Sequence, residues 1–281
     1  MTFRTEHLAE GVEIHLGDSR EITPQIGLVD MIFTDPPYGH NNNNGDLIHR
    51  IEDAIPGRRK RGDDGSAVYD PRPIANDGPE AAHELAQWLF DIAPKVLRAG
   101  GCCCCCCCGG GGPDPQFARW ALMMDGPLDF KQMIVWDKGP MGMGWHYRRS
   151  YETVLVGQKP GAACKWYDES DRIENIIRPG YLGISKIIPK ATDHPTPKPP
   201  ELARHFIRLH TKPGERVFDP FTGGGSSGVA AVLEGRGFVG IEIDQTWFDL
   251  ACRRISQALC QPDLFVPIPE PSPQTQEAFA L

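Results

Sequence analysis

The chain has 281 residues, of which 40% are hydrophobic and 23% charged, and its formal net charge is −8. That length is sufficient for one large domain with a sizeable core. The negative charge argues against a protein that coats nucleic acid non-specifically, so any DNA binding requires local positive patches. No apolar run approaches the roughly 18 residues that span a bilayer, and no signal-peptide pattern is present, which predicts a soluble cytoplasmic protein.

The first predicted strand is Val12–Leu16, where apolar and polar residues alternate. It stops at Gly17-Asp18, which leaves an acidic residue at the C-terminal end of a strand. In an open α/β sheet that position faces a ligand. Asp18 could equally be the N-cap of a helix that begins near Arg20, and the sequence leaves both interpretations open.

A short, largely apolar run begins at Val29, and the second predicted strand, Asp30–Thr34, lies in it and ends in Asp35-Pro36-Pro37-Tyr38. The prolines remove N–H donors and stiffen the backbone, so the groups that remain are acceptors. The Asp35 carboxylate and the Pro36 carbonyl can accept both hydrogens of an exocyclic amine while Tyr38 stacks on its ring. Such a site activates an aryl amine without a strong base. The structural alternative is a proline-stiffened turn.

Residues 39–78 show little periodicity and contain four consecutive asparagines and the basic cluster Arg58-Arg59-Lys60-Arg61. We predict an insertion beside the proposed site. It is either a disordered surface loop or a loop that contacts DNA and orders on binding.

The stretch Glu80–Arg98 has the spacing of an amphipathic helix, which Pro94 ends or bends. Seven of the ten cysteines follow as the run Cys102–Cys108. Consecutive side chains of a strand point to opposite faces, and no Cys-x2-Cys pair lies elsewhere. We therefore predict a buried strand of small apolar residues and no metal site.

Helix and strand patterns then alternate over Pro115–Met124, Phe130–Trp136 and Glu152–Val156. This alternation predicts a mostly parallel sheet with helices on both faces. A glycine-rich loop in residues 137–150 carries aromatic and basic side chains, a mixture that suits phosphates and an unstacked base. The candidates are Trp145, Arg148 and Arg149.

The C-terminal half contains a strand that ends at Asp219, a turn with Gly223 and Gly225, and a helix that begins near Gly228. Glu242 lies at the end of the next strand. The glycines satisfy G-x-G-x-x-G, which taken alone also predicts a nicotinamide or flavin site. Against that interpretation, the lead-in from Asp219 is unlike a dinucleotide turn. In addition, the residues that follow are too few for a separate substrate domain.

The residues from about Val12 to Ala258 resemble the amino-group DNA methyltransferases. The family's Asp/Asn/Ser-Pro-Pro-Tyr/Phe motif matches residues 35–38, and its Asp-Pro-Phe-x-Gly-x-Gly form matches residues 219–225. The resemblance implies a doubly wound, mostly parallel α/β sheet of the S-adenosyl-L-methionine-dependent methyltransferase (Rossmann-like) type. The catalytic motif comes first, as in the family's β arrangement, a circular permutation of the common methyltransferase fold.

The resemblance also implies a reaction, a cofactor and site residues. Aspartate in the first motif position is the usual form in N6-adenine enzymes, which flip the base from double-stranded DNA; N4-cytosine methylation is the alternative. Asp35, Pro36, Pro37 and Tyr38 would hold the target amine and base. The cofactor S-adenosyl-L-methionine would contact Asp18, Asp35, Thr196, Lys198, Asp219, Phe221, Gly223, Gly225, Ser226, Ser227 and Glu242.

The predicted methyltransferase domain covers residues 1–260, with a catalytic half at 12–160, a target-recognition segment at 161–193 and a cofactor-binding half at 194–258. The proline-rich residues 261–281 are a predicted disordered tail. Within it, Gln261-Pro-Asp-Leu264-Phe265 resembles peptides that bind the bacterial replication sliding clamp, although chance composition explains it as well. From other classes of function, a nicotinamide-dependent oxidoreductase and a catalytically idle DNA-binding protein remain alternatives.

Overall fold

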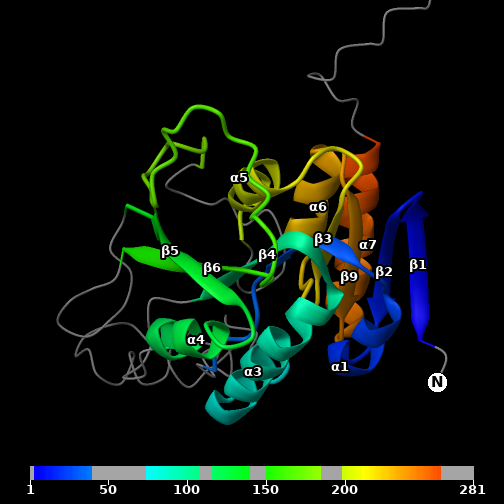
Figure 1. Cartoon of the computed structure of the whole chain (residues 1–281). Helices are drawn as coiled ribbons and strands as arrows, with labels where there is room; N and C mark the ends of the chain where they lie inside the picture. Colours follow the sequence, from blue (N-terminus) through cyan, green and yellow to red (C-terminus); the bar gives the residue numbers. More distant parts are fainter. Residues whose placement is uncertain (1–2, 40–73, 108–115, 140–149, 185–197, 261–281) are drawn as a thin grey trace, which may run out of the picture.

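The computed structural model describes residues 3–39, 74–107, 116–139, 150–184 and 198–260 (Figure 1). In this part of the chain a nine-stranded sheet has the order β1-β2-β9-β8-β3-β4-β6-β5-β7. The strands are β1 (Arg4–Ala9), β2 (Val12–Leu16), β3 (Val29–Thr34), β4 (Leu97–Cys107), β5 (Asp129–Asp137), β6 (Tyr151–Gln158), β7 (Ile176–Ile177), β8 (Arg216–Asp219) and β9 (Gly237–Glu242).

The helices lie between these strands in the chain. They are α1 (Ser19–Ile22), the short 3-10 helix η1 (Thr23–Gln25), α3 (Pro79–Val96), α4 (Gln116–Met124), α5 (Pro200–His210), α6 (Ser226–Leu233) and α7 (Gln245–Leu259). No described helix is long and apolar enough to cross a membrane.

Five central strands, β2, β9, β8, β3 and β4, run parallel to one another. Strand β1 forms an antiparallel edge with β2, and β6 runs antiparallel to both β4 and β5. The predicted mostly parallel α/β sheet is therefore confirmed at its centre, and the sheet is mixed because its β4–β6–β5 side is antiparallel.

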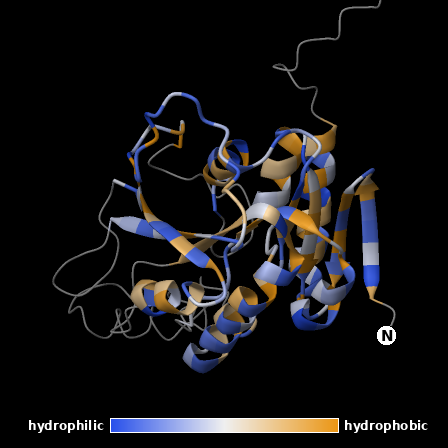
Figure 2. Ribbon diagram, in the orientation of Figure 1, coloured by the Kyte–Doolittle hydropathy of each residue, from blue (hydrophilic) through white to orange (hydrophobic). Residues whose placement is uncertain are grey.

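Two apolar clusters, one on each face of the sheet, make this a three-layer fold. One cluster joins the sheet to α5, α6 and α7, and the other joins it to α1, α3 and α4. Figure 2 shows the apolar residues gathered on the central strands. The central strands are covered on both faces, and all six residues of β3 are buried. Four of them are apolar, and the two polar ones, Asp30 and Thr34, are hydrogen-bonded.

The cysteine strand follows the period of two that a strand imposes. Cys102, Cys104 and Cys106 belong to the cluster on the α5 side, whereas Cys103, Cys105 and Cys107 belong to the cluster on the α3 side. The prediction of a buried strand is thus confirmed for residues 102–107, and Cys108 lies outside the described residues.

Several boundaries differ from the predicted ones. Helix α3 continues through Pro94 but ends at Val96, and Leu97 already belongs to β4. Pro94 removes one backbone N–H donor from the last turn, and the helix ends two residues later. Strand β9 ends at Glu242 because Asp244 accepts hydrogen bonds from two backbone N–H groups and caps α7.

Candidate active site

The C-terminal ends of β3, β8 and β9 lie side by side, because these parallel strands are close in the sheet. A single cavity opens there. In an open α/β sheet this edge is the usual place for a ligand. Twelve of the predicted site residues line it: Asp18, Asp35, Pro36, Pro37, Tyr38, Lys198, Asp219, Phe221, Gly223, Ser226, Ser227 and Glu242.

Asp35, directly after β3, is held from two directions. Lys198 Nζ lies 2.7 Å from its Oδ2, and the Tyr38 hydroxyl donates to its Oδ1. Lys198 also lies 4.9 Å from the centre of the Tyr38 ring. Burial and the nearby Asp35 charge raise the pKa of Tyr38 well above its usual value, so the tyrosine stays a hydroxyl donor. A carboxylate has about four lone-pair positions, so Asp35 can still accept from a ligand.

Lys198 was predicted as a neighbour of the cofactor, and the structure also places it against the proposed catalytic carboxylate. Its second anionic neighbour is Glu152, whose Oε2 lies 3.4 Å from Lys198 Nζ. Burial alone would lower the pKa of Lys198, but the Asp35 and Glu152 carboxylates raise it above the usual value. Lys138 donates to the other oxygen of Glu152, Oε1, at 2.7 Å. The group therefore contains two carboxylates and two ammonium ions.

The side chain of Asp219, at the end of β8, is buried. It accepts hydrogen bonds from Thr34 Oγ1 at 2.6 Å, from Phe221 N at 3.0 Å and from the Ser227 hydroxyl. Burial raises the pKa of Asp219 to about 6. The Thr34 contact joins the strand that carries Asp35 to the strand that carries the glycine turn.

Glu242, at the end of β9, accepts a hydrogen bond from the backbone of the glycine turn. Its Oε2 accepts from Gly223 N at 2.7 Å and its Oε1 from Asp244 N at 2.8 Å. Burial raises the pKa of Glu242 to about 7. Gly225 has φ 79° as the N-cap of α6, a conformation that glycine favours, and it is not among the residues that line the cavity.

Asp18 combines both roles that the sequence left open. It caps α1 by accepting from Arg20 N at 2.8 Å, and it lines the cavity. A hydrogen bond from the Arg20 side chain lowers the pKa of Asp18. The carboxylate is therefore ionised at the edge of the site.

Some residues of the site were not predicted. Glu152 enters it from β6, and Trp247 lines it from α7. Neither belongs to a motif, and both reach the site only through the folding of distant strands and helices. Other predicted residues lie outside the described part of the chain: Arg58, Arg59, Lys60, Arg61, Trp145, Arg148, Arg149, Thr196, Gln261, Leu264 and Phe265.

Two features on adjacent parallel strands define a Rossmann-like methyltransferase. One is the proline-rich acceptor motif, and the other is the glycine turn with an acidic residue at the next strand end. The chain belongs to the DNA methylase family (N6_N4_Mtase), whose model matches residues 29–253. This membership decides against the nicotinamide interpretation of the glycine turn.

Named relatives cover most of the chain. The chain is 39% identical over 260 residues to the DNA adenine methyltransferase YhdJ of Escherichia coli (strain K12), covering 82% of this chain and 77% of the relative. It is 27% identical over 244 residues to the type II methyltransferase M2.DpnII of Streptococcus pneumoniae, covering 81% and 82%. Among solved structures, the M1.HpyAVI–SAM complex matches with a TM-score of 0.56 and 26% identity, covering 86% of this chain and 98% of that one.

Proposed function

We propose that the chain is an S-adenosylmethionine-dependent DNA methyltransferase that acts on the N6 amine of adenine. The observation that carries the proposal is the shared cavity, which Asp35-Pro36-Pro37-Tyr38 and the glycine turn line together. Two substrates that must react with each other need such a common space.

In the proposed reaction the chain binds an extrahelical base, whose unstacking costs a few kcal/mol. Tyr38 stacks on the base, while Asp35 and the Pro36 carbonyl accept the two hydrogens of the amine. Because both amine hydrogens are held by acceptors, the lone pair is localised on the nitrogen and directed into the cavity. Lys198 keeps the carboxylate in place through its 2.7 Å contact. The cofactor supplies an electrophilic methyl group when bound.

The residues around the turn fit an adenosine-containing cofactor. Apolar side chains, among them Phe221 and Trp247, lie beside acceptor carboxylates in the same cavity. Glu242, at a strand end, is placed to accept hydrogen bonds from ribose hydroxyls, as in other nucleotide sites of this architecture. Ser226, Ser227 and Asp219 shape the turn itself.

Adenine is favoured over cytosine as the target base. The first motif residue is Asp35, the form usual in the N6-adenine enzymes that the sequence resembles, and one relative is named a DNA adenine methyltransferase. Adenine and cytosine present a similar amidine edge to the site, so the two activities are distinguished by which methylated nucleoside is formed.

The test is methyl transfer from labelled S-adenosylmethionine to unmethylated duplex DNA, followed by nucleoside analysis. The wild type is expected to form N6-methyladenine, and Asp35→Ala to form none while still binding the cofactor. Asp129→Ala, which removes an exposed carboxylate on β5, is the matched control and should be as active as the wild type. N4-methylcytosine as the product, or no transfer to any DNA, would contradict the proposal.

Binding to the replication sliding clamp through Gln261, Leu264 and Phe265 remains a proposal that rests on the peptide pattern alone. A pull-down with purified clamp should retain the chain and lose it after Leu264→Ala/Phe265→Ala. Retention that does not depend on these side chains would remove the idea.

A further inference from the structure

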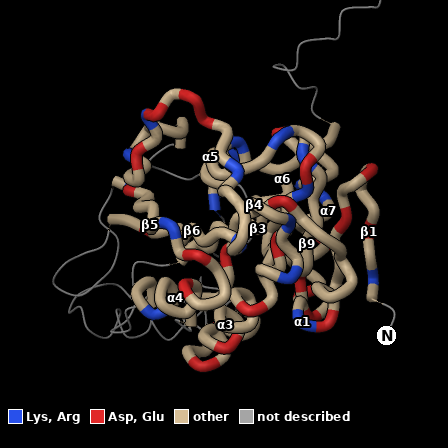
Figure 3. Tube along the Cα trace, in the orientation of Figure 1, with Lys and Arg blue, Asp and Glu red and all other residues tan. Residues whose placement is uncertain are grey.

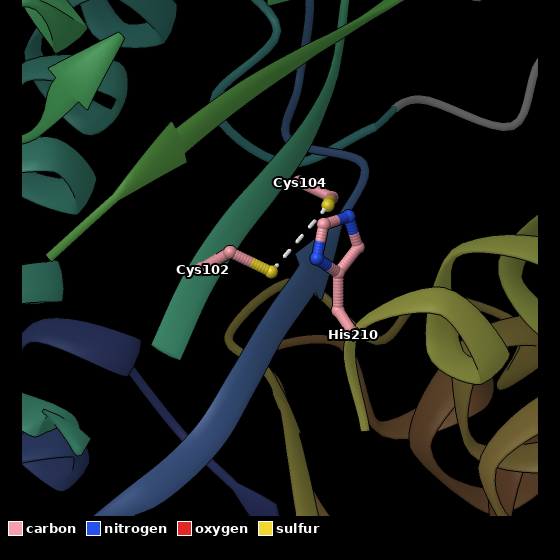
Figure 4. A group of neighbouring side chains, drawn as sticks. All are labelled: Cys102, Cys104 and His210. Atoms are coloured by element: carbon pink, nitrogen blue, oxygen red, sulfur yellow. Dashed lines mark hydrogen bonds between the residues drawn. The ribbon is translucent and has the colours of Figure 1, made fainter. Parts of the chain in front are cut away.

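Two cysteines of β4 and the last residue of α5 form a group outside the proposed active site. Cys102 and Cys104 project from the same face of the strand toward His210 (Figure 4). All three side chains are buried, with relative exposures of 1%, 0% and 4%. Their possible ligand atoms all lie within 4.8 Å of one another.

The spacing of these atoms is close to that of a tetrahedral metal site. The two sulfur atoms are 4.0 Å apart. With a zinc–sulfur bond of about 2.3 Å, tetrahedral geometry places two sulfur ligands about 3.8 Å apart. A small adjustment of either side chain therefore suffices.

The orientation of the imidazole also suits a metal ligand. His210 Nδ1 lies 3.0 Å from the carbonyl oxygen of Lys165, a contact that requires a proton on Nδ1. In the neutral ring Nε2 then carries the lone pair. A backbone carbonyl that fixes the tautomer in this way is a regular feature of metal-binding histidines.

The chemistry of the group suits a soft cation. Thiolate and imidazole are the ligands that zinc prefers, and the thiols lose their protons when the metal binds, so binding should release protons.

A cavity lies between the β5 side of the sheet and α5, and His210 is one of its lining residues. This cavity gives an ion a route to the group. Cys164 also lines it, but its thiol donates to the carbonyl oxygen of Lys165 at 3.6 Å.

We propose that Cys102, Cys104 and His210 bind one Zn²⁺ ion. Two sulfurs and one nitrogen, with a fourth position left for a water molecule, form a known zinc ligand set, and soft thiolates with imidazole select zinc over magnesium or calcium. The sequence predicted no metal site because neighbouring cysteines of a strand point to opposite faces and no Cys-x2-Cys pair lies elsewhere. Alternate cysteines of the run nevertheless supply two ligands on one face, and His210 comes from a distant segment.

A disulfide between Cys102 and Cys104 is the competing use of the same atoms. Alternate residues of a strand have Cα atoms about 6.6–6.8 Å apart, at the upper limit for a disulfide. A metal bridges these sulfurs at their present separation, whereas a disulfide requires the strand to bend.

The test is metal binding by the purified full-length chain, measured by elemental analysis after chelation and reconstitution with Zn²⁺ or Co²⁺. The wild type is expected to bind one ion per chain, and its Co²⁺ form to show thiolate-to-cobalt charge-transfer bands and tetrahedral ligand-field bands. Cys102→Ser, Cys104→Ser and His210→Gln are each expected to weaken binding at least about tenfold.

The matched controls are Cys103→Ser and Cys105→Ser, in the same strand but on its opposite face. They should bind the ion as tightly as the wild type. A wild type without bound ion after reconstitution, or equal losses in the two sets of variants, would overturn the site. If the ligand variants fail to fold, the cobalt spectrum of the wild type decides, because absent charge-transfer bands exclude thiolate ligation.

Discussion

Lys198 separates two carboxylates that would otherwise face each other in a buried space. Its Nζ lies 2.7 Å from Asp35 and 3.4 Å from Glu152, and its side chain is only 12% exposed. A lysine between two anions stays charged and fixes both of them. We infer that Lys198 is a positioning residue for Asp35, because it touches the carboxylate that receives the amine.

Lys198→Met should therefore lower kcat by about 100-fold, the order expected when a reacting group is misplaced. Lys138→Met is the matched control, because Lys138 binds Glu152 but makes no described contact with Asp35. It should retain most of the activity. Steady-state kinetics on duplex DNA measures both variants. Equal losses would assign the effect to Glu152 instead of Asp35.

Glu242 makes cofactor binding depend on pH. Burial raises its pKa to about 7 in the free protein, and ribose hydroxyls donate more strongly to the ionised carboxylate than to the neutral acid. Binding then lowers this pKa, so the affinity should rise about tenfold as the pH increases from about 6 to 8. Calorimetric titration with S-adenosylmethionine in buffers of different ionisation enthalpy measures the affinity and the released proton. Glu242→Gln should bind more weakly and show no such dependence; a dependence that persists would point to Asp219.

At the scale of elements, the turn between β8 and α6 is fixed by its contact with α7. Gly225 has φ 79°, and a Cβ atom there would lie 2.9 Å from Ala251 Cα. Gly214 has φ 82° and open space around it. The two glycines share the backbone conformation and differ in the space available.

Gly225→Ala and Gly214→Ala should each lose about 1–2 kcal/mol of unfolding free energy, because both place a side chain in the left-handed region. Gly225→Ala should lose about 1–3 kcal/mol more, because α7 must move to accept the extra methyl group. Denaturant unfolding of both variants measures the difference. Equal losses would show that the turn is not confined by α7.

The elements that local pattern determines were predictable from sequence. Strand β3 is mostly apolar, and α3 has apolar residues at helical spacing, so each was found within two residues of its bounds. The antiparallel direction of β6 was not, because strand direction depends on which neighbour a strand pairs with. The same holds for the site: the two motifs were visible, but the contact of Lys198 with Glu152 joins residues whose spacing in sequence carries no signal.

On the scale of the whole molecule, charge must be arranged locally for DNA to bind. The formal net charge is −8, and Figure 3 shows basic and acidic residues intermixed along the described chain. The densest basic sequence, Arg58-Arg59-Lys60-Arg61, lies outside the described residues. We propose it as a phosphate-binding segment.

Replacing these four residues by glutamine should weaken DNA binding and flatten its salt dependence. If all four contact phosphates, the slope of log K against log salt becomes less negative by about 3.6, which is about 0.9 for each lost charge. Fluorescence anisotropy over a range of salt concentrations measures the slope. Cofactor affinity, measured in parallel, should not change. An unaltered slope would exclude the cluster from the DNA interface.

The strand order also decides when the chain can fold during its synthesis. Strands β8 and β9 are the last to be made, yet they lie between β2 and β3, which are among the first. On their facing edges, β3 therefore has no neighbour until β8 has been made, and β2 has none until β9 has been made as far as residue 242. Such long-range pairing makes folding slow and leaves unpaired edges open to aggregation. The nascent chain is thus most vulnerable until β9 has been made, and ribosome-bound chaperones should hold it longest at that stage.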